Sequence, residues 1–458
     1  MSSIVLNLHN SKTRARMVFQ PFDAAQVKIY VCGPTVYDRA HLGNARTVVV
    51  FDVLVRLLRQ LYPRVIYVRN ITDIDDKINA RAAETGEAIS AITARTTDWF
   101  HQDMAALYCL PPDIEPRATG SIREIIAMID VLIARGHAYE AEGHVLFAVA
   151  SDPDYGRLSG RSPDELRAGA RVDVAAYKRD PGDFVLWKPS TPDLPGWDSP
   201  WGVGRPGWHI ECSAMIHAAL GETIDIHGGG SDLLFPHHEN EIAQSRCAFP
   251  DGAFARFWVH AGMLQVDGQK MSKSLGNFRT VQDVLDGAPS GVSGGAPGEA
   301  VRFLLLKTQY RGVLDFTNAA LSEAKRELDR FYRALAPYAD LEAQAPPIEF
   351  MTALADDLNT PAAIAEMHRL ADGALQGARD KAVSLYAAGK LLGLFNQSAE
   401  TWFRGGIDQE RVDALIARRI AARGARDFAE ADRLRREIEA MGLILEDGPN
   451  NSSSVRIR

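Results

Sequence analysis

Two spacings of apolar residues alternate over the first part of the chain. A short run rich in β-branched and aromatic residues, "VKIYVCG" (27–33), is typical of a buried strand. Apolar residues then recur at helical spacing in "NARTVVVFDVLVRLLRQL" (44–61), and a second strand pattern follows in "RVIYVRNIT" (64–72). This order predicts a βαβ unit, so we expect an α/β first domain built on a parallel sheet.

The pattern changes near residue 119 and returns near residue 223. Helical "IREIIAMIDVLIARG" precedes apolar "HVLFAVA" and the Pro-, Gly- and Trp-rich "LWKPSTPDLPGWDSPWGVGRPGW", which together indicate an insertion. "TIDIHGGGSD" (223–232) resumes the strand pattern of the first domain. Its glycines predict a tight turn at the strand end, where a nucleotide or amino acid could approach the backbone closely.

After residue 317 the pattern is mostly that of amphipathic helices. "NTPAA" (359–363) predicts a helix start, with Thr360 as its cap and Pro361 in its first turn. "GAPSGVSGGAPGE" (287–299) is rich in Gly, Ser and Pro and predicts a mobile loop. These changes in residue pattern and composition along the chain predict segments at 1–118, 119–203, 204–260, 261–316, 317–404 and 405–458.

Composition narrows the class of protein. The chain has 458 residues, of which 46% are hydrophobic and 24% charged, as in ordinary globular domains. Its four cysteines are widely spaced, which favours a reducing compartment, and we expect the cytoplasm. We expect no signal peptide and no membrane span. The net charge is −8, so a polyanionic partner would need a local basic surface.

Two motifs suit a phosphate-bearing ligand. His41, Gly43 and Asn44 fall at the predicted start of a helix, where free amides and the helix dipole attract anions. "QKMSKSLGN" (269–277), called the lysine loop below, carries Lys270 and Lys273, whose ammonium groups suit a departing pyrophosphate. Polar helix starts and lysine-rich surface loops are also common without any ligand.

The segment "FPHHENEIAQS" (235–245) concentrates histidines and glutamates. It could be a helix surface, an acid/base pair or half of a metal site. His237 and Glu241 stand at i and i+4 and share a helix face, and Pro236 is a good first residue for that helix. The zincin pattern fails, because Ile242 stands where its second histidine belongs.

Longer strings resemble a known family. "HLGN" (41–44) with "KMSKS" (270–274) resembles the signature motifs of class I aminoacyl-tRNA synthetases. "YVCGPTVYD", "NITDIDDKI", "DFVLWKPS", "GRPGWHIECSAM" and "DIHGGGSDLLFPHHENEIAQS" then look like the cysteinyl-tRNA synthetase family, from about residue 27 to the C-terminus. The resemblance implies an α/β fold with a Rossmann-like parallel-sheet catalytic domain and an insertion. A helical bundle and a small C-terminal anticodon-binding domain follow.

The same resemblance gives the predicted segments their roles. Residues 1–118 and 204–260 would be the two halves of the catalytic domain, and 119–203 the connective insertion. Residues 261–316 would hold the lysine loop and a region that contacts the tRNA stem. Residues 317–404 would form the helical bundle, and 405–458 the anticodon-binding region.

The resemblance also implies one Zn²⁺ per chain, held by Cys32, Cys212, His237 and Glu241. These are all accepted zinc ligands, and a zinc that takes the substrate's thiolate would separate cysteine from serine without a hydrolytic editing site. His238 and Glu239 are expected to point elsewhere. From the residues alone, other ligands stay possible (His209, His217, His227 and His238). Cys109 and Cys247 are expected to be buried or idle thiols.

By the same resemblance the reaction is ligation in two steps. Cysteine attacks the α-phosphorus of ATP, with Mg²⁺ accompanying the nucleotide, and the terminal ribose of tRNA-Cys then takes the cysteinyl group. The catalytic residues that the resemblance implies are His41, Asn44, Lys270 and Lys273. The implied ATP-binding residues are His41, Gly43, Asn44, Gly228, Gly229, Gly230 and Lys273, and the implied amino-acid-binding residues are Thr72, Trp208, His227 and Asp232.

The C-terminal segment supplies the expected contact with tRNA. Between residues 404 and 426 there are six arginines against three acidic residues, which indicates a local basic surface. The resemblance places Arg423, Phe428, Asp432 and Asp447 at anticodon bases, where arginine, carboxylates and a stacking ring fit unpaired nucleotides. Arginine-rich helices are also often only solvated faces. We expect a monomer.

The sequence departs from the family pattern at three places, and two rival functions are considered. Asn44 replaces the second histidine of the first motif, 287–299 replaces a more ordered segment, and the tail after "DGP" is atypical. One rival is the cysteine:amino-sugar ligase of mycothiol synthesis, which lacks a matching anticodon module. The other is a non-catalytic, zinc-stabilised RNA-binding protein, which the two intact motifs disfavour.

Overall fold

The computed structural model describes residues 4–161, 175–287, 296–338, 340–342, 344–404, 409–440, 443–447 and 453–457. The predicted mobile loop at 287–299 therefore lies mostly outside the described residues. None of the described helices combines the length and the apolar character that a membrane crossing requires.

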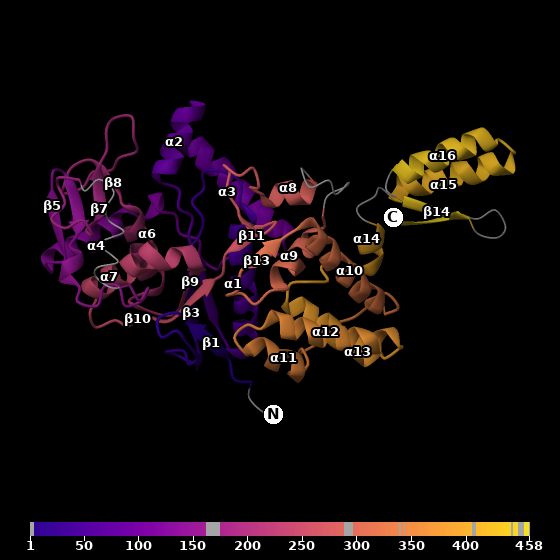
Figure 1. Cartoon of the computed structure of the whole chain (residues 1–458), viewed down its shortest axis with the longest axis horizontal. Coiled ribbons are helices and arrows are strands. Elements are labelled where there is room, and N and C mark those ends of the chain that lie inside the picture. The colour runs from indigo at the N-terminus through magenta and orange to yellow at the C-terminus, as the bar shows by residue number, and fades with distance from the viewer. Residues whose placement is uncertain are drawn as a thin grey trace.

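A parallel sheet forms the centre of the molecule (Figure 1). Its strands are β3 (Val27–Val31), β4 (Val65–Arg69), β9 (Thr223–Gly230) and β10 (Phe254–Ala261), in the order β10-β9-β3-β4. Helix α1 (Leu42–Leu61) joins β3 to β4 and packs on the sheet. The predicted βαβ unit and the α/β fold class are confirmed.

The order of the strands creates a junction between β3 and β9. Strand β4 pairs with one edge of β3, and β9, which comes much later in the chain, pairs with the other edge. Ligands of open α/β sheets bind at the carboxyl ends of the strands where the order reverses. Cys32 directly follows β3, and Gly228, Gly229 and Gly230 end β9 at this point.

The glycine turn predicted at 228–230 is wrong, because β9 continues through Gly230. A Cβ on Gly228 would lie 2.2 Å from the ring of Phe51, and one on Gly229 would lie 3.0 Å from His238. These glycines therefore let a helix and an imidazole approach the strand closely. Packing rather than a turn requires them.

The insertion is a small antiparallel sheet with one covering helix. It comprises α4 (Ile122–Ala134), β5 (Ala138–Ala141), β6 (His144–Phe147), β7 (Phe184–Pro189) and β8 (Gly204–Pro206). Its core includes Phe147, Trp187 and Leu132, and it continues into α6 (Trp208–Leu220) and α7 (Glu239–Ala248) through Ile210 and Ala243. The insertion thus packs against the two helices that follow it in the chain.

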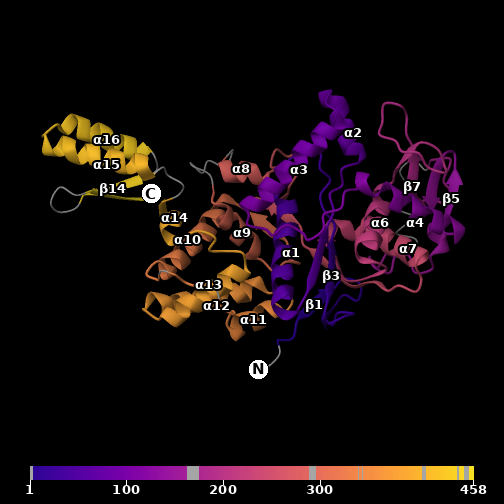
Figure 2. The same cartoon turned by 180° about the vertical axis from the view of Figure 1, so that it is seen from behind.

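The remaining elements lie outside the insertion. They are β1 (Asn7–Asn10), β2 (Ala15–Val18), α2 (Asp76–Thr85), α3 (Ile89–Ala106), β11 (Leu264–Val266), β12 (Gln269–Lys270), α8 (Val281–Asp286), α9 (Gly298–Leu306), β13 (Leu314–Phe316), α10 (Asn318–Leu335), α11 (Ile348–Ala355), α12 (Thr360–Leu375), α13 (Arg379–Leu391), α14 (Ala399–Arg404), α15 (Gln409–Gly424), α16 (Phe428–Ala440), β14 (Leu443–Asp447) and β15 (Ser453–Ile457). Both views place α15, α16 and β14 at the end of the molecule opposite the insertion (Figure 2).

The start of α12 differs from the prediction by one residue. Asn359 is the cap, and its side chain accepts the backbone N–H of Ala362 at 3.1 Å. The hydroxyl of Thr360 instead donates to the carbonyl of Leu306 at 2.6 Å, inside the bundle. A tertiary partner for Thr360 thus leaves the capping position to Asn359, whereas the expected proline in the first turn is present.

A buried charge network fixes α1 to the helical bundle. Asp52 of α1 pairs with Arg302 of α9, and both side chains are almost fully buried. Arg56 also pairs with Asp52 at 2.8 Å, and Arg302 donates to the carbonyl of Leu392 at 2.6 Å. Burial alone would raise the pKa of Asp52, but Arg302 and Arg56 more than offset this, so its pKa is lowered.

Replacing Arg302 should therefore destabilise the protein strongly. Arg302→Met leaves the Asp52 carboxylate buried with one partner fewer, which is expected to cost about 3–5 kcal/mol in urea unfolding at pH 7. Because the folded pKa of Asp52 is lowered, its stabilisation is present above the unfolded pKa of about 4 and fades as the pH falls through the folded pKa. The cost should shrink accordingly towards acid pH.

The exposed pair Arg16–Asp356 supplies the control. Its side chains are 52% and 49% exposed, so Arg16→Met should change the unfolding free energy by less than about 1 kcal/mol. Equal effects of the two substitutions would contradict the assigned role of the buried network.

Candidate active site and metal centre

The start of α1 forms a reciprocal cap. His41 is the N-cap, and its Nδ1 accepts the backbone N–H of Asn44 at 3.2 Å. The side-chain oxygen of Asn44 accepts the backbone N–H of His41 at 3.3 Å. Asparagine at this position thus closes a capping box that a second histidine would not form in the same way. Burial lowers the pKa of His41, Asp232 opposes this shift, and Lys273 and Lys77 add to it.

The lysine loop lies beside this helix start. Just after the loop, the backbone carbonyl of Arg279 accepts the N–H of Leu42 at 3.1 Å. The backbone N–H of Val281 donates to the carbonyl of Ala40 at 2.9 Å. Lys273 is 61% exposed, and its ammonium group pairs with Asp38 at 2.7 Å. The two motifs that the sequence separates by more than two hundred residues therefore meet in space.

A cavity of about 360 Å³ opens between them. Its wall carries the predicted residues His41, Gly43, Asn44, Thr72, Trp208, Gly230, Asp232 and Lys270, together with Cys32, Cys212 and His237. His227, Gly228 and Gly229 do not line it; they lie buried in β9 beneath its wall. One cavity thus joins the start of α1 and the lysine loop to the two cysteines and His237.

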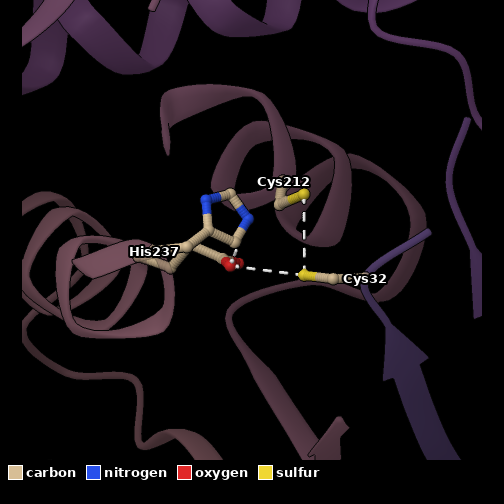
Figure 3. Close-up of side chains that lie close together, drawn as sticks. Cys32, Cys212 and His237 are labelled. Atoms are coloured by element: carbon tan, nitrogen blue, oxygen red, sulfur yellow. Dashed lines mark hydrogen bonds and ion pairs between the residues drawn. The ribbon is translucent and has the colours of Figure 1, made fainter. Parts of the chain in front are cut away.

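Cys32, Cys212, His237 and Glu241 come together at this cavity, and Figure 3 labels the first three. Cys32, Cys212 and His237 line its wall, whereas Glu241 is fully buried. The sulfur atoms of Cys32 and Cys212 are 3.8 Å apart, and Cys32 Sγ lies 3.4 Å from Glu241 Oε1. His237 Nε2 lies 3.0 Å from the same oxygen. The ligand atoms of all four lie within 4.8 Å of one another, which suits a single metal ion. The group is buried and could bind a metal.

Separate elements deliver these ligands. Cys32 follows β3, Cys212 lies in α6, and Glu241 lies in the first turn of α7. The chain is extended at Phe235 (φ −142°, ψ 133°) and helical from there into α7, which agrees with the expectation that Pro236 is the first residue of the helix of His237 and Glu241. The i, i+4 relation brings His237 onto Glu241.

A second group of possible ligands shares two members with the first. It consists of Cys32, His227, His238 and Glu241. His227 Nε2 lies 3.0 Å from Glu241 Oε2, and His238 Nε2 lies 3.9 Å from Glu241 Oε1. The expectation that His238 points away is therefore wrong. Its Nδ1 contacts His260 at 2.8 Å, which turns Nε2 towards the cluster.

The other histidines and cysteines considered from the sequence have different surroundings. His209 Nδ1 lies 3.1 Å from His237 Nδ1, so it orients the imidazole of His237 from outside. His217 stacks on Phe249 instead. Neither Cys109 nor Cys247 belongs to a described metal-binding group, and burial raises the pKa of each thiol to about 12.

The members of the first quartet shift one another's pKa values. A hydrogen bond from Cys32 lowers the pKa of Cys212 to about 6 against the effect of burial, while the pKa of Cys32 is raised. Burial opposes both remaining shifts, yet Glu241 raises the pKa of His237 to about 10, and His227 together with His237 holds the pKa of Glu241 well below its usual value. The two sulfurs of the quartet offer soft ligands. The donor set fits a thiophilic divalent metal.

One buried residue beside Thr72 and Cys212 was missed by the sequence reasoning. Asn70 is fully buried; its side chain donates to Thr72 Oγ1 at 3.0 Å and accepts the backbone N–H of Gly33 at 2.8 Å. It follows β4 at the carboxyl end of the sheet, which was the available signal. Trp208 is 39% exposed and stacks on His237 with ring centroids 4.4 Å apart.

The predicted anticodon residues lie in the C-terminal unit. Arg423 is in the last turn of α15, Phe428 begins α16 and is 64% exposed, and Asp432 is exposed. Asp447 ends β14, and its side chain lies outside the described part of the chain.

The basic surface expected there is smaller than the count of arginines indicates. Arg411 and Arg418 pair with Glu437 and Glu430 of α16, at 3.7 and 3.3 Å. Arg419 is 4% exposed. Salt bridges between α15 and α16 thus neutralise part of the positive charge that the count of arginines predicts for this surface.

The fold and the cavity define a class of enzyme. Residues 18–326 match the family model for the class I (C) catalytic domain of tRNA synthetases, and residues 349–400 match the DALR domain. Methionyl-tRNA synthetase of Mycobacterium tuberculosis, solved with methionyl-adenylate, shares the fold with a TM-score of 0.56 at 15% identity. It covers 82% of this chain and 93% of its own.

Curated relatives narrow the class. Cysteine–tRNA ligase of Acidiphilium cryptum is 75% identical over 98% of this chain and 99% of its own length. The ligase of Gluconobacter oxydans is 60% identical over 99% and 98%. The chain belongs to the cysteine–tRNA ligase family, which confirms the resemblance drawn from the motifs.

Metal content separates the two overlapping groups of ligands. If the quartet of Cys32, Cys212, His237 and Glu241 holds the ion, His237→Ala should lower zinc affinity by more than about a hundredfold, because a direct ligand is lost. His238→Ala should lower it by about tenfold or less. Competition with a chromophoric chelator measures both. The reverse order of the two effects would assign the metal to His227 and His238.

Proposed function

We propose that this protein activates L-cysteine with ATP and transfers the cysteinyl group to tRNA-Cys, releasing AMP and pyrophosphate. One observation carries the proposal. Three members of the sulfur-rich quartet (Cys32, Cys212 and His237) line the same cavity as His41, Gly43, Asn44 and Lys270 of the two motifs. A thiol-bearing amino acid and a nucleotide bound there would meet. The high identity to curated cysteine–tRNA ligases over nearly the full chain supports the same reaction.

Cys32, Cys212, His237 and Glu241 would hold one Zn²⁺. When bound, zinc supplies affinity for a thiolate, which cysteine offers and serine does not. The chain's own part is to keep the quartet buried and dry beneath the cavity, so that a hydroxyl gains little there. His209 orients His237, and Trp208 covers the same imidazole with its indole.

The phosphate side of the cavity would bind ATP together with Mg²⁺. His41 has a lowered pKa, so at neutral pH it is an uncharged hydrogen-bonding group at the positive end of α1. Gly43 and Asn44 form the same helix start, and Gly230 lies on the facing wall. Lys270 lines the cavity and Lys273 lies on the loop beside it. Their ammonium groups would stabilise the departing pyrophosphate.

The amino group and carboxylate of cysteine would lie between the strand ends. Thr72 and Asp232 line the cavity there, and Asn70 holds Thr72 in place. His227 would act from beneath, since it contacts Glu241 rather than the cavity. Gly228 and Gly229 would contribute through close packing of β9. No covalent enzyme intermediate is needed, because attack by the carboxylate requires mainly positioning and charge stabilisation.

Transfer to tRNA would use the ends of the elongated molecule. The terminal 2′-hydroxyl would enter the cavity, while the C-terminal unit reads the anticodon with Arg423, Phe428, Asp432 and Asp447. The exposed ring of Phe428 supports this assignment, since stacking on an unpaired base needs a free face. We keep the segment boundaries at 118, 203, 260, 316 and 404 as part of the proposal. Free cysteines support a cytoplasmic location, and we expect a monomer.

Pyrophosphate exchange tests the amino-acid specificity. The protein should exchange labelled pyrophosphate into ATP with cysteine at least about a hundredfold faster than with serine, because only the thiol can use the quartet. Removing zinc with a chelator should lower the exchange with cysteine. Comparable exchange rates with the two amino acids would contradict the proposal.

Phe428→Ala tests the anticodon contact. Loss of one base-stacking ring is expected to lower kcat/KM for tRNA-Cys by about tenfold to a hundredfold. Pyrophosphate exchange measured without tRNA should not change, because Phe428 begins α16, which contributes no described residue to the wall of the cavity. Unchanged aminoacylation would remove Phe428 from the proposed anticodon contacts.

A further inference from the structure

A segment of the insertion, residues 152–161, lies along the metal-bearing helix α7. Arg246 of α7 pairs with Asp152 and, at 3.3 Å, with Asp154. The hydroxyl of Tyr155 donates to the side-chain oxygen of Asn240 at 2.5 Å. The guanidinium of Arg161 stacks 3.9 Å from the ring of Phe235. The segment thus follows α7 and the turn before it; we call it the bracing segment.

Glu239 makes the most deeply buried of these contacts. Its side chain is 1% exposed. One carboxylate oxygen accepts the backbone N–H groups of Gly156 at 2.9 Å and Leu158 at 3.4 Å. The other accepts that of Ser159 at 2.7 Å. A buried carboxylate that is bound by successive backbone amides holds its neighbours rigidly, since charge-assisted hydrogen bonds are short and directional.

Glu239 lies between the proposed metal ligands His237 and Glu241 in the sequence, so its contact with the bracing segment affects where these two ligands lie. Successive residues of an α-helix are about 100° apart, so residues two positions away point to nearly opposite sides. His237 and Glu241 face the two cysteine sulfurs, while Glu239 faces the bracing segment. On the ligands' side, the hydroxyl of Ser213 of α6 donates to the backbone carbonyl of Glu241 at 3.4 Å. The first turn of α7 is therefore held from both sides.

We propose that Glu239 is a positioning residue for the metal centre. By anchoring the first turn of α7 to the bracing segment, it fixes where His237 and Glu241 meet Cys32 and Cys212. The insertion thus helps to set the metal affinity although it supplies none of the four ligands. This inference rests on the proposed metal role of that quartet.

Metal affinity, measured without any turnover, tests this role. In Glu239→Gln the amide NH₂ replaces an acceptor oxygen and faces backbone donors. Its zinc affinity is expected to fall by about tenfold to a hundredfold, as for other residues that orient ligands. Cobalt substitution gives a second readout: the thiolate-to-cobalt absorption should need more cobalt to saturate, and the visible bands should shift. Cysteine KM should rise more than kcat falls when zinc saturates the enzyme.

Arg246→Gln is the matched control. It removes ion pairs to the same bracing segment, but at a residue further along α7 and away from the ligands. Its thermal stability should fall, while its zinc affinity should change by less than about threefold. If Glu239→Gln binds zinc as wild type does, or if Arg246→Gln loses as much affinity for the same loss of stability, the inference is wrong.

A second variant covers the case in which Glu239→Gln does not fold. Glu239→Asp keeps both acceptor oxygens on a shorter side chain, so a smaller loss of affinity in the same direction is expected. Wild-type affinity in Glu239→Asp would also overturn the inference. A wild-type protein that binds no zinc would instead refute the proposed quartet, so the two failures can be told apart.

Discussion

The burial of two cysteine sulfurs, an imidazole and a carboxylate within reach of one another, at the junction of β3 and β9, is the constraint on which the rest of the site depends. Cys32 Sγ lies 3.8 Å from Cys212 Sγ and 3.4 Å from Glu241 Oε1, and His237 Nε2 lies 3.0 Å from the same carboxylate oxygen. Buried polar and ionisable groups need partners, and one metal ion could serve all four. Under the proposed function, a metal with affinity for sulfur would give the cavity its selectivity for a thiol.

The surrounding structure can be understood as support for that cluster. The parallel sheet places Cys32 at a strand end, and glycines in β9 let Phe51 and His238 approach the strand. The helices α6 and α7 bring the remaining ligands from the other half of the catalytic domain. The insertion packs on both helices, which explains why a segment without ligands is built into the middle of the catalytic domain.

Much of this could be predicted from the sequence, where local pattern or long motifs carried the information. The helix at 44–61 and its flanking strands follow from apolar spacing, and the structure shows them at Leu42–Leu61, Val27–Val31 and Val65–Arg69. The quartet came only from the resemblance, since spacing alone left other histidines open. The structure brings its members within bonding range of one ion, yet it also offers a second group with His227 and His238.

The predictions that were wrong depended on contacts between distant segments. Thr360 does not cap α12 because Leu306 accepts its hydroxyl, and the glycines after His227 stay in a strand because a ring packs against them. His238 faces the cluster because His260 holds its other nitrogen. In the C-terminal unit, glutamates of α16 pair with arginines that the count had assigned to the surface. Local sequence contains none of these partners.

The position of the metal tests the central claim most directly. Anomalous diffraction from crystals of the zinc-loaded protein, recorded on both sides of the zinc absorption edge, would locate the ion. The account predicts one peak about 2.0–2.3 Å from the ligand atoms of Cys32, Cys212, His237 and Glu241. A peak bound by His227 and His238 instead, or no zinc peak at the cavity, would contradict it.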